Sequence, residues 1–279
     1  MIPYEVIALR YGHHPRPLSQ NFVYPPDSGD PHDGPSAIDY FVWVIRNPER
    51  TIVVDTGFDT PEGEARGRTM LCHPVEGLRR LGVDPETVRD VIITHLHYDH
   101  AGNLGAFPNA TFHLQDAEMA FATGRCMCHG RLRSTFAVED VVAMVRRVHA
   151  GRVRFSDGDA ELCPGVSVHL VPGHTRGLQC VRVETGRGPV VLASDAAHLA
   201  ANIREGNPFP ILVDMPAMFE SWRRLEALAG HPDRVVPGHD PAVMRLYPRH
   251  PCREVEAVLL HAEPGAGPEP GAGSEPGAG

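Results

Sequence analysis

Ten short apolar segments rich in β-branched residues are the feature that most constrains the fold of this chain. Each is bounded by Gly, Pro, Asp or Asn, a pattern typical of β-strands. The segments cover residues 4–9, 38–45, 51–55, 90–94, 110–114, 152–155, 166–171, 180–184, 189–194 and 234–238. Because every strand must find a hydrogen-bonding neighbour, so many strands require one large sheet or two smaller ones.

Helical periodicity separates some of these strands. Apolar residues recur at helical spacing from Val138 to Val148, and a second such stretch begins at Pro216 and ends before Gly230. A shorter helix is predicted over residues 74–81. Strands with helices between them predict an α/β or α+β fold, with two sheets or one sheet covered by helices.

Two segments have a different character. Residues 11–37 contain six prolines and little periodicity, which predicts a long loop. Residues 263–279 repeat EPGAG and contain no large apolar side chain, so we expect a disordered tail there. The remaining chain, residues 1–262, is predicted to form a single domain.

Composition excludes several classes of partner. The 279 residues carry a formal net charge of −9, and all 26 basic residues are arginine, so no basic surface for nucleic acid is expected. No segment approaches the roughly 20 apolar residues of a membrane helix. The N-terminus shows no signal-peptide pattern, and the six cysteines are scattered. We therefore predict a cytoplasmic protein with reduced thiols and no membrane association.

The densest cluster of ligand-type residues is THLHYDHAG, residues 94–102. On an extended segment His95 and His97 point the same way, and a turn after Tyr98 can place Asp99 and His100 together. Two pairs suggest two metal ions. Further candidates follow other predicted strands: His174, Asp195 and His239.

The motifs THLHYDHAG, PGHT, SDA and PGHD, in this order, resemble those of the metallo-β-lactamase-fold superfamily. The similarity covers roughly residues 38 to 245. It implies an αββα sandwich with the metal site at one edge of the two sheets. It also implies that Asp55, in VVDTG, supports the metal-bearing loops instead of binding metal.

The resemblance assigns a role to each ligand. One metal would be held by His95, His97 and His174, the other by Asp99, His100 and His239, with Asp195 bridging both. Imidazole and carboxylate ligands suit zinc, with iron, manganese or cobalt as alternatives. Two such ions can share a hydroxide that attacks an ester carbonyl, and Asp99 could hold or shuttle the proton.

Among branches of the superfamily, the chain is most similar to the compact N-acyl-homoserine lactonases. The likeness includes a helical insert over residues 116–150 and the lengths between motifs. This predicts a quorum-quenching hydrolase of a small-molecule lactone. A carboxylic ester or thioester hydrolase is the alternative enzyme, and an inactive metal-stabilised binding module is the non-enzymatic one. By analogy with relatives, a homodimer is possible.

One position departs from the lactonase pattern. Those enzymes generally have a tyrosine three residues after the bridging Asp, whereas this chain has His198. Imidazole can also donate a hydrogen bond, so we predict that His198 takes a catalytic and substrate-binding role. Phe209, which follows soon after, is a candidate for lining the substrate pocket.

Overall fold

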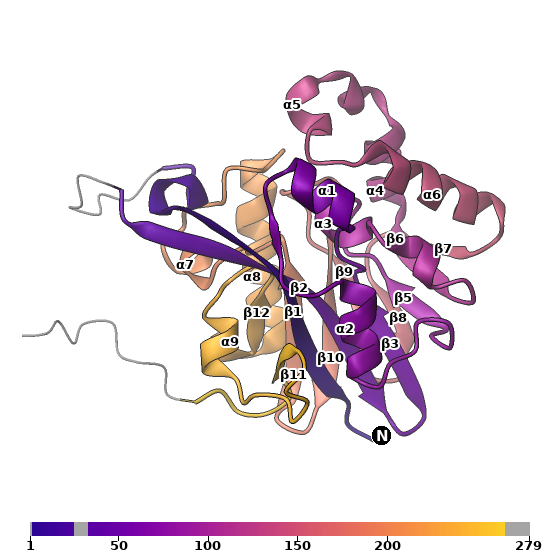
Figure 1. The fold of residues 1–279 in the computed structure, drawn as a ribbon. Helices are drawn as coiled ribbons and strands as arrows, with labels where there is room; N and C mark the ends of the chain where they lie inside the picture. Colours follow the sequence, from indigo (N-terminus) through magenta and orange to yellow (C-terminus); the bar gives the residue numbers. More distant parts are fainter. Residues whose placement is uncertain (1, 25–32, 266–279) are drawn as a thin grey trace, which may run out of the picture.

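The computed structural model describes residues 2–24 and 33–265, and these residues form two β-sheets flanked by helices (Figure 1). The first sheet contains, in pairing order, β13 (Glu256–Leu259), β1 (Glu5–Pro17), β2 (Pro35–Asn47), β3 (Arg50–Val54), β5 (Asp90–Ile92), β6 (Thr111–Gln115) and β7 (Val153–Ser156), with β4 (Thr69–Met70) paired to β1. The second contains β12 (Val235–Pro237), β11 (Gly188–Ser194), β10 (Gln179–Thr185), β9 (Val166–Leu170) and β8 (Ala160–Cys163).

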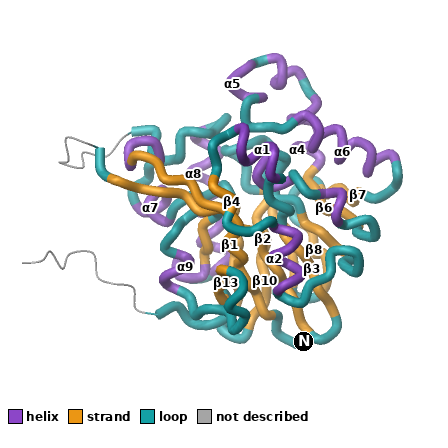
Figure 2. Tube along the Cα trace, in the orientation of Figure 1, coloured by secondary structure: helices purple, strands orange, loops and turns teal. Residues whose placement is uncertain are grey.

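The helices lie outside the sheets and in the connections between strands (Figure 2). The α-helices are α1 (Thr60–Ala65), α2 (Pro74–Arg80), α3 (Tyr98–Ala101), α4 (Asp116–Thr123), α5 (Gly130–Arg133), α6 (Val138–His149), α7 (Ala200–Arg204), α8 (Met215–Ala229) and α9 (Val243–Leu246). Short 3₁₀ helices are η1 (Leu18–Asn21), η2 (Leu104–Ala106), η3 (Arg125–Cys128) and η4 (Pro232–Arg234).

The core is organised in layers. Alternate residues of β1 face opposite sides: Val6 and Ala8 pack in the cluster between the sheets, whereas Ile7 and Leu9 pack in the cluster beneath the helices. The outer face of the second sheet is covered by α8, whose Leu225 is fully buried. The result is the predicted αββα sandwich.

All ten predicted strands are present, as are the three predicted helices. The boundaries of α8 follow the sequence signals: Asp214 caps its N-terminus, Pro216 lies in its first turn, and Gly230 ends it in the left-handed conformation with φ 69°. The structure adds β4, β8 and β13. These strands are short and contain Glu or only two residues, so they carried no clear sequence pattern.

The prediction of a loop over residues 11–37 is wrong for much of its length. Tyr11 to Pro17 extend β1, and residues 35–37 begin β2, so that the two strands form a long hairpin arm whose register runs to Pro17 opposite Pro35 (Figure 2). The prolines are tolerated because this part of β1 and β2 extends past the neighbouring strands. One edge of each strand there needs no hydrogen-bonding partner. Residues 25–32 of the predicted loop lie outside the described residues.

The segment 116–150 contains α4, η3, α5 and α6, which gather at one end of the molecule, at the top of Figure 1. Of the predicted disordered tail, residues 266–279 lie outside the described residues. Among the helices in the described ranges 2–24 and 33–265, none combines the length and apolar character needed to cross a membrane.

Candidate metal centre

The seven predicted ligands lie where strands end at one edge of the two sheets. The chain leaves β5 into a loop that carries His95 and His97, and the one-turn helix α3 carries Asp99 and His100. Three other strands supply the rest: His174 follows β9, Asp195 follows β11 and His239 follows β12. All seven side chains are buried.

The backbone around Asp195 is held in an uncommon conformation. Ser194 has φ 48°, in the left-handed region that residues other than glycine rarely adopt. Gly238 packs directly against it, since a Cβ at position 238 would lie 2.6 Å from the Ser194 carbonyl oxygen. The glycine of PGHD therefore allows the end of β12 to approach the end of β11, which brings His239 to Asp195.

The Asp195 carboxylate lies at the centre of the site. Its Oδ2 atom is 3.2 Å from Nε2 of His174 and 3.8 Å from Nε2 of His95. Its Oδ1 atom is 3.1 Å from Nε2 of His100 and 3.0 Å from Nε2 of His239. One oxygen thus faces each set of histidines, which is the placement that a bridging ligand needs.

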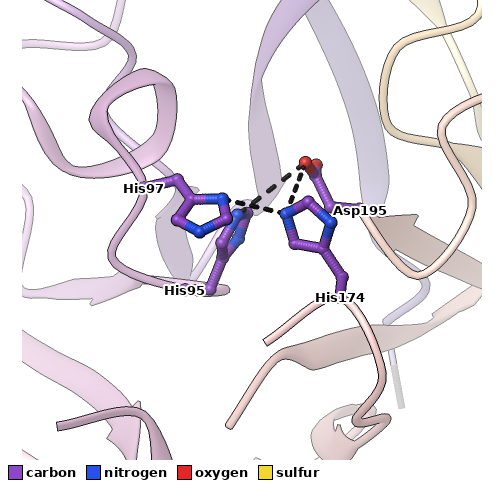
Figure 3. A group of neighbouring side chains, drawn as sticks. All are labelled: His95, His97, His174 and Asp195. Carbon is purple, nitrogen blue, oxygen red and sulfur yellow. Dashed lines mark hydrogen bonds and ion pairs between the residues drawn. The ribbon is translucent and has the colours of Figure 1, made fainter. Parts of the chain in front are cut away.

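The potential ligands gather into the two predicted groups. Within each group the donor atoms all lie within 4.8 Å of one another. The first group is His95, His97, His174 and Asp195 (Figure 3), and the second is Asp99, His100 and His239. A third, overlapping group consists of Asp195, His198 and His239.

In several of these histidines, the ring nitrogen that faces away from the centre has a hydrogen-bond partner, as is usual for metal-bound imidazoles. Such contacts fix both the ring orientation and the nitrogen left for metal. They join His100 Nδ1 to Asp55 Oδ2 at 2.7 Å, His174 Nδ1 to the Ile211 carbonyl at 2.7 Å, His239 Nδ1 to the Asp39 carbonyl at 2.7 Å, and His97 Nε2 to Thr135 Oγ1 at 2.8 Å.

Asp55 supports the ligand loop, as predicted from the sequence. Its buried carboxylate accepts hydrogen bonds from the backbone N–H of Thr94 at 2.7 Å and from the Thr94 hydroxyl at 2.8 Å, in addition to its contact with His100. One side chain therefore fixes the start of the THLHYDHAG motif and a predicted ligand six residues further on.

Burial keeps the histidines of the first group neutral. It lowers the pKa of His95 and His97 well below the usual value, helped by neighbouring imidazoles, and lowers the pKa of His174 to about 3. The Nε2 atom of His95 is buried and has no hydrogen-bond partner among residues 2–24 and 33–265. Neutral imidazoles with a free inward lone pair are what a divalent cation requires.

The second group has the opposite electrostatics. Burial alone would lower the pKa of His100 and His239, but the Asp195 and Asp99 carboxylates outweigh it and raise both pKa values. Burial would raise the pKa of Asp195, but the surrounding histidines hold it well below the usual value. The buried Asp99 and Asp195 carboxylates therefore favour positive charge beside them, which bound divalent cations would supply. The residues fit a dinuclear metal site.

Comparison with known proteins agrees with this geometry. The family model of the metallo-beta-lactamase superfamily matches residues 38–239, which include all seven ligands. The chain belongs to this superfamily. The match begins in β2 and ends at the last predicted ligand.

Curated relatives and solved structures lie within the same superfamily. An N-acyl homoserine lactonase of Bacillus cereus is 31% identical over 218 residues, which cover 71% of this chain and 81% of the relative. A crystal structure of Bacillus thuringiensis AiiA with N-decanoyl-L-homoserine at its active site superposes with a TM-score of 0.71 at 25% identity, over 88% of this chain and 96% of that one. AidC, a dizinc quorum-quenching lactonase, superposes with a TM-score of 0.67 at 18% identity, over 86% and 89%.

The two predicted substrate-contacting residues meet beside the metal ligands. The rings of His198 and Phe209 stack with centroids 3.7 Å apart and planes 3° apart, and His198 Nε2 lies 3.1 Å from Asp195 Oδ2. Both residues line a cavity of about 310 Å³ that opens onto Asp99 and Asp195. Phe209 therefore fixes the plane of the His198 imidazole as well as forming part of the cavity wall.

Sequence reasoning missed several residues that complete the site. Thr135 and Glu118 hold the ligand loops from the helical insert, and Arg16 and Arg68 enter the cavity from the hairpin arm and from the start of β4. Each acts on residues remote in sequence. An acidic residue inside the otherwise apolar run AEMAFA was the one local signal, at Glu118.

Removing metal should lower the stability of this superfamily member. Without cations the buried carboxylates lose their compensating charge. Metal at about 100 times its Kd stabilises a protein by about 2.7 kcal/mol, so we expect chelation to lower the Tm by about 5–10 °C. Differential scanning calorimetry before and after dialysis against EDTA, with zinc added back, measures this. An unchanged Tm would contradict a resident metal site.

Proposed function

We propose that this chain is a dinuclear metallohydrolase that opens lactone rings, with N-acyl-homoserine lactones as the leading substrates. The observation that carries the proposal is the convergence of seven buried imidazole and carboxylate groups, with one Asp195 oxygen facing each histidine set. Support comes from relatives named as N-acyl homoserine lactonases. Hydrolysis would consume a quorum-sensing signal.

The seven predicted ligands divide into two metal sites. His95, His97 and His174 would hold one ion, Asp99, His100 and His239 the other, and Asp195 both. Imidazole and carboxylate donors without a thiolate favour zinc. When bound, the paired ions supply Lewis acidity and lower the pKa of water. A cytoplasmic location and a homodimer stay predictions.

Two residues of the chain would act on the substrate itself. His198 lines the cavity and can donate a hydrogen bond that orients the lactone carbonyl. Asp99 also lines the cavity, and its carboxylate can take a proton from the attacking water. As water adds to the carbonyl carbon and the ring C–O bond breaks, Asp99 returns that proton to the leaving oxygen, which becomes a hydroxyl group.

The test is a substrate screen with protein shown by elemental analysis to hold two zinc ions per chain. Proton release is followed for short- and long-chain N-acyl-homoserine lactones, an aryl ester and a glutathione thioester. We expect kcat/KM to be at least tenfold higher for a lactone than for the ester or thioester. A zinc-loaded protein that leaves every lactone intact would refute the proposal.

His198→Ala should reduce turnover far more than metal content. Loss of one hydrogen-bond donor to a reacting carbonyl costs about 10²–10³ in kcat, whereas all seven predicted metal ligands remain. Steady-state kinetics and elemental analysis on the same preparation separate the two effects. If zinc content falls in parallel with kcat, His198 is a metal ligand, as its proximity to Asp195 and His239 would allow.

A further inference from the structure

Four arginines line the cavity over the candidate metal centre: Arg16, Arg66, Arg68 and Arg131. The only carboxylates in the same lining are Asp99 and Asp195, which belong to the predicted metal ligands. Arg66 is paired with Glu62 at 2.5 Å. Among residues 2–24 and 33–265, no carboxylate pairs with the other three arginines.

Arg16 and Arg68 are positioned by neighbouring strands. Arg16 lies near the end of β1, and Arg68 directly precedes β4, which pairs with β1 at His13 opposite Thr69. Both side chains are half-buried. Between them His14 has its pKa lowered to about 4, by burial first and then by the charges of Arg68 and Arg16. His14 is therefore neutral at pH 7 and adds no further positive charge beside the two guanidiniums.

Aromatic rings lie between each guanidinium and the candidate metal centre. The Arg16 guanidinium carbon lies 4.8 Å from the centroid of Phe209, which stacks on His198. In the described part of the chain the Nε atom of Arg16 is buried and has no hydrogen-bond partner, and burial lowers the pKa of the guanidinium. Within residues 2–24 and 33–265, this guanidinium donates a hydrogen bond to the Gln20 carbonyl at 2.6 Å.

Arg68 is held by phenols, which carry no charge at neutral pH. Its Nε donates to the Tyr98 hydroxyl at 3.1 Å, and that hydroxyl lies 3.2 Å from the hydroxyl of Tyr40. The Tyr40 ring in turn contacts the ring of His239. Arg68 thus lines the cavity with no carboxylate paired to it in the described part of the chain, although burial is outweighed by the phenols and the more distant Asp99, which favour its charged form and raise its pKa.

We propose that Arg16 and Arg68 form a subsite for an anionic group, carboxylate or phosphate, on the substrate of the adjacent metal centre. Partly buried guanidiniums without a counter-charge are costly, and a planar or tetrahedral oxyanion matches their paired N–H donors. Hydrolysis itself creates one carboxylate at the metal ligands. Arg16 lies against Phe209, and Arg68 is held by Tyr98 beside Tyr40, so the subsite is set apart from the predicted ligands and would serve a second anionic group.

This inference rests on the proposed function and narrows it. The preferred substrate becomes a lactone or ester that carries its own negative charge, unlike an unmodified N-acyl-homoserine lactone.

Binding of simple acids tests the subsite without catalysis. Calorimetry on zinc-loaded protein compares succinate, glutarate and adipate with butyrate, pentanoate and hexanoate, and 3-phosphonopropionate with succinate. We expect at least tenfold tighter binding of the diacid at one chain length. Tighter binding of the phosphonate would identify a phosphate subsite. Equal affinity of diacids and monoacids at every length would overturn the proposal.

Variants assign the preference to the two arginines. Arg16→Gln and Arg68→Gln should each abolish most of the diacid preference, and Arg16→Lys and Arg68→Lys should restore part of it. Arg223→Gln, on the exposed face of α8 where the side chain is 78% exposed, makes the same change in net charge and should leave the preference intact. A preference that persists in both Gln variants would also overturn the proposal.

A kinetic comparison separates this proposal from the proposed function. N-succinyl- and N-glutaryl-homoserine lactone are compared with their terminal carboxamides, which differ only in charge. Faster hydrolysis of the charged lactones supports both proposals. Equal kcat/KM for charged and uncharged forms would refute the subsite and retain the lactonase. Arginine-dependent diacid binding without hydrolysis of any lactone would retain the subsite and refute the lactonase.

Discussion

Asp195→Asn is expected to lower lactone hydrolysis by at least about 10³-fold. Polarisation of the carbonyl by metal lowers the activation free energy of such reactions by several kcal/mol, and each 1.36 kcal/mol changes the rate about tenfold. Among the described residues, Asp195 is the one carboxylate with oxygens within 4 Å of histidines from both sets. Asparagine has nearly the same shape but offers one neutral oxygen, so it cannot compensate cations on both sides.

Metal content distinguishes this explanation from a general loss of structure. We expect elemental analysis to show one zinc or fewer per chain in Asp195→Asn, with an unchanged circular dichroism spectrum. Asp233→Asn makes the same substitution at a side chain that is 69% exposed and should keep two ions and full kcat/KM. Two bound ions with more than a tenth of wild-type activity in Asp195→Asn would show that the bridging role is misassigned.

The parts of this site that could be predicted from the sequence carry their own local signal. Ligand histidines and acids are dense in residues 94–102, and each remaining ligand follows a strand whose β-branched composition marks it. The strand and helix patterns alone predict two sheets or one sheet covered by helices, and the resemblance to the superfamily implies the αββα sandwich. In the structure, alternate residues of β1 do face opposite sides.

The parts that could not be predicted depend on tertiary proximity. The hairpin arm contains prolines that favour a loop, and only its pairing with β2 makes it a strand. Arg16 and Arg68 are 52 positions apart and meet because β4 adds to β1. No spacing rule relates such residues, so the arginines that line the cavity could be identified only from the fold.

Glu118 illustrates the same limit at a residue with a large expected effect. It lies in α4, yet its buried carboxylate accepts hydrogen bonds from the Leu96 N–H at 2.9 Å, the Thr175 hydroxyl at 2.6 Å and the Gly177 N–H at 3.1 Å. Leu96 separates two predicted ligands, and Thr175 follows another. One side chain of the helical insert therefore fixes both loops of the first metal group.

Glu118→Ala should destabilise the protein by about 5 kcal/mol, because it leaves three buried donors without an acceptor, each costing about 1–3 kcal/mol. This corresponds to a fall in Tm of about 10–20 °C. Zinc affinity should also fall by about 10–100-fold, as when outer partners of ligands are removed. Thermal denaturation and competitive zinc titration measure the two effects.

Two variants serve as controls. Glu118→Gln keeps an acceptor and should lose less stability and less zinc affinity. Glu220→Ala, with its side chain 71% exposed on α8, should change stability by less than about 0.5 kcal/mol. If Glu118→Ala melts like Glu220→Ala and binds zinc like the wild type, the loops of the first group are held by the strands alone, and the insert contributes nothing to the metal centre beyond Thr135.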